Sequence, residues 1–102
     1  MNFESVWKEA RAAAATTKSE PNVFKGCGFA WITISGRGNF AKFAKEHIGV
    51  HKNYAGKGFI IWYTHVYNSC SQNMDEHYEA CSKAAAVLRK YGIEANVNCR
   101  YD

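Results

Sequence analysis

The sequence predicts an α+β fold with a ferredoxin-like β-α-β-β-α-β antiparallel sheet and an extra N-terminal helix. Residues 27–35 and 59–67 are apolar on alternating positions of both faces, as expected of strands that are covered on both sides. Each is followed by a segment with helical spacing, and a last strand follows over residues 93–101. A length of 102 residues fits a single domain over 1–102, with the N-terminal helix in 1–18 and the α+β core in 26–102.

The first predicted element is a helix over residues 2–16. Its apolar residues recur at spacings of three and four, and Pro21 lies in the connector that ends it. This helix is additional to the ferredoxin-like pattern, and we expect its apolar stripe to cover the open face of the sheet. The stripe consists of Phe3, Val6, Trp7, Ala10 and Ala14.

The strand over residues 27–35 divides its side chains between two faces. Ala30, Ile32 and Ile34 point to one face, and Phe29, Trp31 and Thr33 point to the other. The glycines of residues 36–38 break the strand. Asn39 is the predicted N-cap of a helix that ends at Gly49.

The second half of the core repeats the pattern. Residues 50–54 form a short edge strand, residues 55–58 a turn, and residues 59–67 the second long strand. Asn73 caps a long helix that Gly92 ends. Its predicted buried stripe comprises Met74, Tyr78, Cys81, Ala85 and Leu88.

One face of the predicted sheet is covered by the helices after residues 38 and 73, and the other carries aromatic residues. Phe29, Trp31 and Tyr63 are therefore candidate sheet-face or interface residues. Such platforms stack bases in RNA-recognition domains, but the basic-Gly-aromatic run of that module is not present. Cover by the first helix or by a second subunit is the favoured interpretation, so a homodimer is one expected assembly.

The positive charge of the chain is concentrated between residues 36 and 58. The formal net charge is +4, and this stretch holds five basic residues against Glu46 alone. It could bind an acidic partner or phosphates, or simply be a solvated surface. The turn over residues 36–39 precedes a helix N-terminus, which favours anions, although a tight strand-to-helix turn is the more common explanation. The candidate binding residues are Arg37, Gly38, Asn39, Lys42, Lys45, Lys52, Tyr54 and Lys57.

The sequence argues against an enzyme and against a metal or cofactor. No CxxC pair, HExxH motif or Gly-x-Ser-x-Gly elbow is present. Cys27 and Cys99 start and end neighbouring predicted strands, so with Arg100 they could form a reactive site, although buried, inert cysteines are more common. No run of 18 apolar residues occurs, so we expect no membrane contact and a cytoplasmic protein with free thiols.

The segment from Cys27 to Asp102 resembles a group of small uncharacterised proteins encoded by tailed bacteriophages. The resemblance rests on the CGFAW start at residues 27–31, on Gly38-Asn39 and on a tryptophan in the middle strand, Trp62. It continues through Gln72, the VLR run at residues 87–89 with Tyr91-Gly92 beyond it, and the basic-x-Asp terminus at residues 100–102. It implies a phage or prophage setting in the host cell cytoplasm and adds no catalytic residues.

Two binding functions and one enzymatic function follow as hypotheses. The first is a phage-type accessory protein that binds and blocks a host protein or nucleoprotein complex, such as an inhibitor of a host defence (anti-CRISPR-like) complex. The alternative is a nucleic-acid or nucleotide-binding protein that uses the basic segment of residues 36–58. The third is a small enzyme that uses Cys27 with Arg100.

Overall fold

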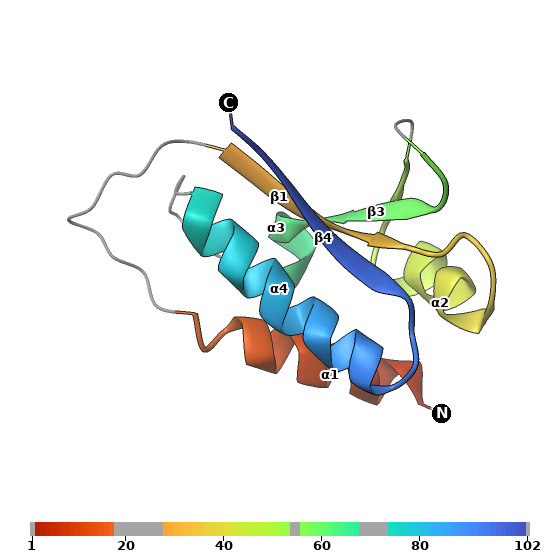
Figure 1. Ribbon diagram of the computed structural model, residues 1–102. Coiled ribbons are helices and arrows are strands. Elements are labelled where there is room, and N and C mark those ends of the chain that lie inside the picture. The colour runs from red at the N-terminus through yellow and green to blue at the C-terminus, as the bar shows by residue number, and fades with distance from the viewer. Residues whose placement is uncertain (1, 18–27, 54–55, 68–73, 102) are drawn as a thin grey trace.

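The chain forms a four-stranded antiparallel sheet with helices, in the α+β class that the sequence predicts. The computed structural model describes residues 2–17, 28–53, 56–67 and 74–101. In chain order the elements are α1 (Phe3–Ala14), β1 (Gly28–Ile34), α2 (Asn39–His47), β2 (His51–Lys52), β3 (Phe59–Trp62), α3 (Tyr63–Val66), α4 (Met74–Lys90) and β4 (Ala95–Tyr101) (Figure 1). The strand order is β2-β3-β1-β4, so β1 and β3 are the two interior strands.

Strand β1 separates an apolar inner face from an open outer face. Ala30, Ile32 and Ile34 are buried, whereas Phe29, Trp31 and Thr33 are exposed or half-buried on the other side, as predicted from the alternation. Ile32 lies opposite Ile61 of β3 and Val97 of β4. Because residues that face each other in antiparallel strands share a side of the sheet, the three strands contribute to one inner core.

The inner face is covered by α4, with α1 lying alongside it (Figure 1). Ala80, Ala84 and Ala85 of α4 are fully buried, and such small side chains let a helix approach its neighbours closely, which here are α1, β1 and β4. The expectation that the first helix covers the outer face is wrong. Its stripe instead joins the core that α4 and the inner face form, because the flank of α4 provides an apolar surface beside the sheet.

A polar cluster also ties α1 to the end of α4. Glu9 accepts hydrogen bonds from the Lys90 ammonium at 2.5 Å and from the Tyr91 hydroxyl at 2.6 Å. The hydrogen bond from Lys90, followed by that from Tyr91, lowers the pKa of Glu9 from its ordinary value. All three side chains lie at the surface, so solvent and salt screen this contact and the apolar stripe is the main connection.

Helix α2 does not cover the sheet, contrary to the prediction. Among the described residues, the extensive helix contacts of the sheet are with α4, which occupies the inner face. Helix α2 lies at the end of the sheet instead (Figure 1), where Phe3 of α1 meets Phe40 edge to face at 5.5 Å. Gly38, with φ of +95°, takes the N-cap position that the sequence assigned to Asn39. A positive φ suits glycine and turns the chain directly into the helix.

The second long strand is shorter than predicted. It ends at Trp62, and Tyr63–Val66 form a single helical turn closed by a hydrogen bond from the Tyr67 amide to the Tyr63 carbonyl at 2.8 Å. Val66 is buried, and the Tyr63 ring stacks on His77 of α4 at 4.0 Å. Packing against α4 therefore outweighs the strand preference of this β-branched and aromatic segment.

Helix α4 has a buried face rotated slightly from the predicted one. Tyr78, expected in the core, is 43% exposed, whereas His77 is fully buried. Gly92 ends the helix at φ of +80°, and the Ile93 amide donates to the Leu88 carbonyl at 3.0 Å. The predicted cap Asn73 lies outside the described residues.

The different burial of two cysteines gives a first test of how α4 packs against the core. Cys81, on the inward side of α4, is buried, and burial raises its pKa to about 12, whereas Cys99 is exposed. Because the thiolate is the nucleophile, we expect iodoacetamide at pH 8 to alkylate Cys99 and to spare Cys81 until the protein is unfolded. Peptide mapping by mass spectrometry distinguishes the two sites. Equal alkylation of both in the native protein would contradict the packing of α4.

Candidate functional site

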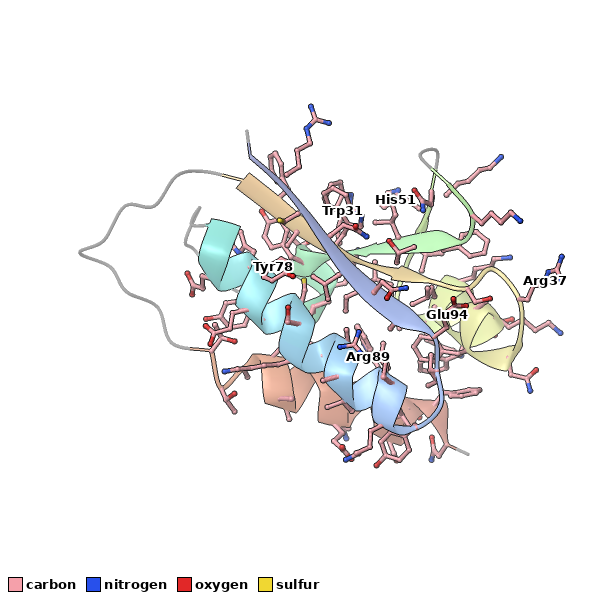
Figure 2. All side chains as sticks on the ribbon, in the orientation of Figure 1. Trp31, Arg37, His51, Tyr78, Arg89 and Glu94 are labelled. Atoms are coloured by element: carbon pink, nitrogen blue, oxygen red, sulfur yellow. The ribbon has the colours of Figure 1, made fainter. Side chains whose placement is uncertain are left out.

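Three aromatic side chains, one exposed and two half-buried, form a cluster on the outer face of the sheet, which we call the aromatic face: Phe29, Trp31 and Trp62. Trp31 lies directly opposite Trp62 in the β1–β3 register, and the two rings meet edge to face at 5.4 Å. Phe29, 39% exposed, meets Trp62 edge to face at 6.0 Å. Figure 2 shows Trp31 on the side of the sheet away from α1 and α4. No helix in the described part of the chain covers this face.

Polar side chains from the neighbouring strands surround the aromatic face. Asn98 of β4 lies opposite Trp31, and its amide donates to the Thr33 hydroxyl at 3.0 Å. Arg100 lies opposite Phe29, and His51 of β2 lies opposite Ile60 on the other flank. The outer face thus combines aromatic rings with hydrogen-bond donors and a guanidinium group.

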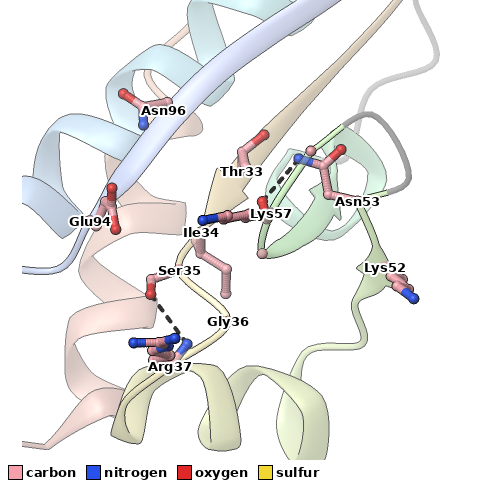
Figure 3. Close-up of a pocket in the computed structure, with 12 residues that line it drawn as sticks. Thr33, Ile34, Ser35, Gly36, Arg37, Lys52, Asn53, Lys57, Glu94 and Asn96 are labelled. Atoms are coloured by element: carbon pink, nitrogen blue, oxygen red, sulfur yellow. Dashed lines mark hydrogen bonds between the residues drawn. The ribbon is translucent and has the colours of Figure 1, made fainter.

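A groove of about 690 Å³, which we call the basic groove, lies at the end of β1 that carries Thr33 and Ile34 (Figure 3). Arg37, Lys52 and Lys57 line it, and Glu94 contributes an acidic side chain. Thr33 and Asn96, which face each other across β1 and β4, line it as well. Because Thr33 also lies on the outer face, the groove and the aromatic face form one continuous surface.

The basic groove is held in shape by the turn before β3. The Asn53 side chain donates to the Lys57 carbonyl at 3.1 Å, and the Asn53 amide donates to the Gly58 carbonyl at 3.1 Å. Gly58, at φ of +91°, lies against the backbone of Ile34. These contacts place Lys57 over the end of β1. Across the groove, the Ser35 hydroxyl accepts a hydrogen bond from the Arg37 backbone amide at 3.2 Å. This bond fixes the start of the turn that leads from β1 into α2.

The structure brings only part of the predicted binding set together. Arg37, Lys52 and Lys57 all line the basic groove, although the Lys52 side chain points away from the other two (Figure 3), whereas Gly38 and Asn39 line a neighbouring hollow that also includes Arg37. The remaining predicted residues have separate places. Lys42 is exposed on α2, the Lys45 ammonium lies 4.4 Å above the Phe59 ring, Tyr63 meets Phe29 at 6.4 Å, and Tyr54 lies outside the described residues.

Sequence reasoning missed several residues of this surface. Trp62 and Asn98 were not among the predicted site residues, and Arg100 was predicted only as a partner of Cys27, yet all three lie beside Trp31 or Phe29. Alternation along each strand gives the face of a side chain. It does not give the register that selects which residues become neighbours.

The predictions on metal binding and on the cysteine pair can be compared with the structure only at the described residues. Within them, no cluster of three or more His, Cys, Asp or Glu side chains could hold a metal ion. Cys99 lies opposite Ala30, and Cys27 lies outside the described residues, so their pairing stays a prediction. No helix in the ranges that the structure describes is long and apolar enough to cross a membrane.

Comparison with known proteins adds no assignment to this geometry. No protein-family model, curated protein or solved structure matches the chain. The resemblance to phage proteins therefore stays a prediction that rests on the motifs of the sequence, and the function has to be inferred from the surface described above.

Proposed function

We propose that this protein binds nucleic acid through the basic groove and the outer face that continues from it. One observation carries the proposal: Arg37, Lys52 and Lys57, which come from separate loops and a strand, line a single groove. Cations that neutralise phosphates release condensed counterions, and this release drives much of nucleic-acid binding. The alternative that the sequence left open, a binder using residues 36–58, is the one this arrangement supports best.

The groove has the chemistry that a phosphate backbone requires. Three cationic side chains outnumber the single acidic one, Glu94, among the described residues that line it. The Arg37 guanidinium can bind two phosphate oxygens at once, and the lysine ammonium groups act as point charges. Ser35 and Asn53 line the same groove and supply neutral polar groups. Contacts of this kind position a nucleic acid without selecting its sequence.

We propose further that the protein acts by covering the nucleic acid that it binds, and not by catalysis. The phage resemblance supports an accessory protein in the host cytoplasm that blocks a host nucleoprotein complex, and covering nucleic acid is one way to do so. For the fold, we infer a ferredoxin-like β-α-β-β-α-β unit. The order β2-β3-β1-β4 with antiparallel neighbours supports it, with α2 displaced to the end of the sheet.

Salt dependence tests the proposed function. Fluorescence anisotropy with a labelled oligonucleotide should show affinity falling roughly 20- to 40-fold between 50 and 200 mM salt, as about three phosphate contacts require. Arg37→Ala and Lys57→Ala should each reduce the slope of log affinity against log salt by about one contact. Lys8→Ala removes an exposed lysine from α1, on the helix side, and serves as the control.

Two results would contradict this proposal. One is the absence of binding to single-stranded and duplex oligonucleotides alike at 50 mM salt. The other is binding whose salt slope responds to Lys8→Ala as strongly as to Arg37→Ala and Lys57→Ala, because the groove would then contribute no more than any surface lysine.

A further inference from the structure

We infer that the nucleic acid is single-stranded, with its bases stacked on the aromatic face and its phosphates in the basic groove. This inference rests on the proposed function and names the class of its ligand. A duplex keeps its base faces stacked on one another, so it offers no flat surface to exposed rings. A single strand offers both unstacked bases and a phosphate backbone, and proteins bind it by combining aromatic platforms with positive grooves.

The two tryptophans are placed as such a platform. They lie opposite each other on the two interior strands, and Asn98 of β4 flanks Trp31 on its other side. Their planes meet at 81°, an edge-to-face contact that occupies the face of only one ring. Trp31 and Trp62 are half-buried, which fixes the rings without removing them from solvent. Holding the rings in place before binding reduces the ordering cost of a stacked complex.

A small apolar hollow extends the platform at the end far from the basic groove. Phe29, Trp62, Tyr63 and Thr64 line a space of about 280 Å³. Tyr63 is held from behind by its stacking on His77 at 4.0 Å. The hollow is open to solvent, and its aromatic walls can contact the flat ring of a base. An unstacked base of a single strand can enter it, whereas a paired base cannot.

The path between the hollow and the groove follows β1. From Phe29 to Ile34 the strand rises about 17 Å at 3.3 Å per residue, a length that several extended nucleotides span. Polar groups accompany this path on β4: Asn96, Asn98 and Arg100 lie opposite Thr33, Trp31 and Phe29. Amide groups can hydrogen-bond base edges, and arginine can bind phosphate or stack on a base.

Charge favours a polyanion over a second copy of this chain on the aromatic face. Arg100 lies at one end of the face, and Arg37, Lys52 and Lys57 lie beyond the other. A symmetric dimer through this face would have to bring these like charges toward one another in both copies, which costs free energy. A phosphate backbone along β1 neutralises the same charges.

The experiment compares labelled 12-mers of dT and rU with a 12-base-pair DNA duplex by fluorescence anisotropy at fixed salt. The single strands should bind at least tenfold more tightly than the duplex. Trp31→Ala and Trp62→Ala should each weaken single-strand binding by about 5- to 100-fold, as loss of one stacked base predicts. Trp31→Phe should retain most of the affinity, because a ring remains. Tyr78→Ala, an exposed aromatic on α4, is the matched control and should change nothing.

The outcomes separate this inference from the proposed function. Equal affinity for duplex and single strands, with no effect of Trp31→Ala or Trp62→Ala but the expected salt slope, would overturn the single-strand inference and leave nucleic-acid binding standing. Absence of binding to every oligonucleotide would overturn both. Concentration-dependent dimers in sedimentation velocity that Trp31→Ala and Trp31→Phe both abolish would assign the face to a second copy. Circular dichroism of each variant checks that the fold is retained.

Discussion

Replacing Gly58 with alanine is expected to lower the free energy of unfolding by about 2 to 3 kcal/mol. Two causes act together. The backbone at Gly58 has φ of +91°, which L-residues rarely adopt, and an added Cβ would run into the carbonyl oxygen of Ile34. Because that oxygen belongs to the backbone of β1, it cannot move aside cheaply. Calorimetry should show a midpoint lowered by roughly 10 to 20 °C.

Gly56→Ala provides the matched control in the same turn. A Cβ there would meet only the Asn53 side-chain nitrogen at 3.5 Å, an ordinary contact, and the midpoint should barely change. Because Gly58 holds Lys57 over the end of β1, Gly58→Ala should also weaken oligonucleotide binding. If the two substitutions destabilise the protein equally, the close approach of this turn to β1 is wrong.

Replacing Ala84 with leucine is expected to cause the second large loss of stability. Ala84 is fully buried in the core that α4 shares with α1 and the sheet, so a larger side chain there must push α4 away from its neighbours. Overpacking of this kind costs about 1 to 3 kcal/mol. Urea unfolding followed by circular dichroism should show a lower midpoint with an unchanged m-value, since the surface exposed on unfolding stays nearly the same.

Ala86→Leu tests whether burial, and not the leucine itself, causes the loss. Ala86 is exposed two residues along the same helix, and leucine and alanine have similar helix propensity. We expect its midpoint to stay within experimental error of the original protein. A destabilisation that matches Ala84→Leu would mean that α4 does not present this face to the core.

The alternation within each strand could be predicted from the sequence because it is a local property. Ala30, Ile32 and Ile34 form the buried side of β1, and Phe29 and Trp31 the outer side, as their spacing indicates. The class of the fold followed from the same local patterns, together with the helix periodicity around them.

The placement of the helices depends on contacts between distant residues, which the sequence does not display. The stripe of α1 fits either face of a sheet equally well by composition. Its place beside α4 depends on the core that the two helices share, to which α4 contributes several buried alanines. Likewise, the turn at Tyr63 forms because His77 offers a ring to stack on.

Individual residues of the candidate site could be predicted from the sequence, but not which of them become neighbours. Arg37, Lys52 and Lys57 stood out by charge, and Phe29 and Trp31 by their place on a strand. The structure shows that Thr33 joins the two groups on one surface. The pairing of Trp31 with Trp62 depends on the β1–β3 register, which the hydrophobic pattern constrains only to an even shift.

The pairing of β1 with β4 also determines how the protein can fold. Thr33 and Asn98, which share a hydrogen bond across these strands, are 65 residues apart. Closing so long a loop costs entropy before any contact repays it, so topologies rich in such distant pairs fold slowly. During synthesis β1 must wait for β4 with its edge uncovered, and this interval is when the nascent chain is most open to aggregation.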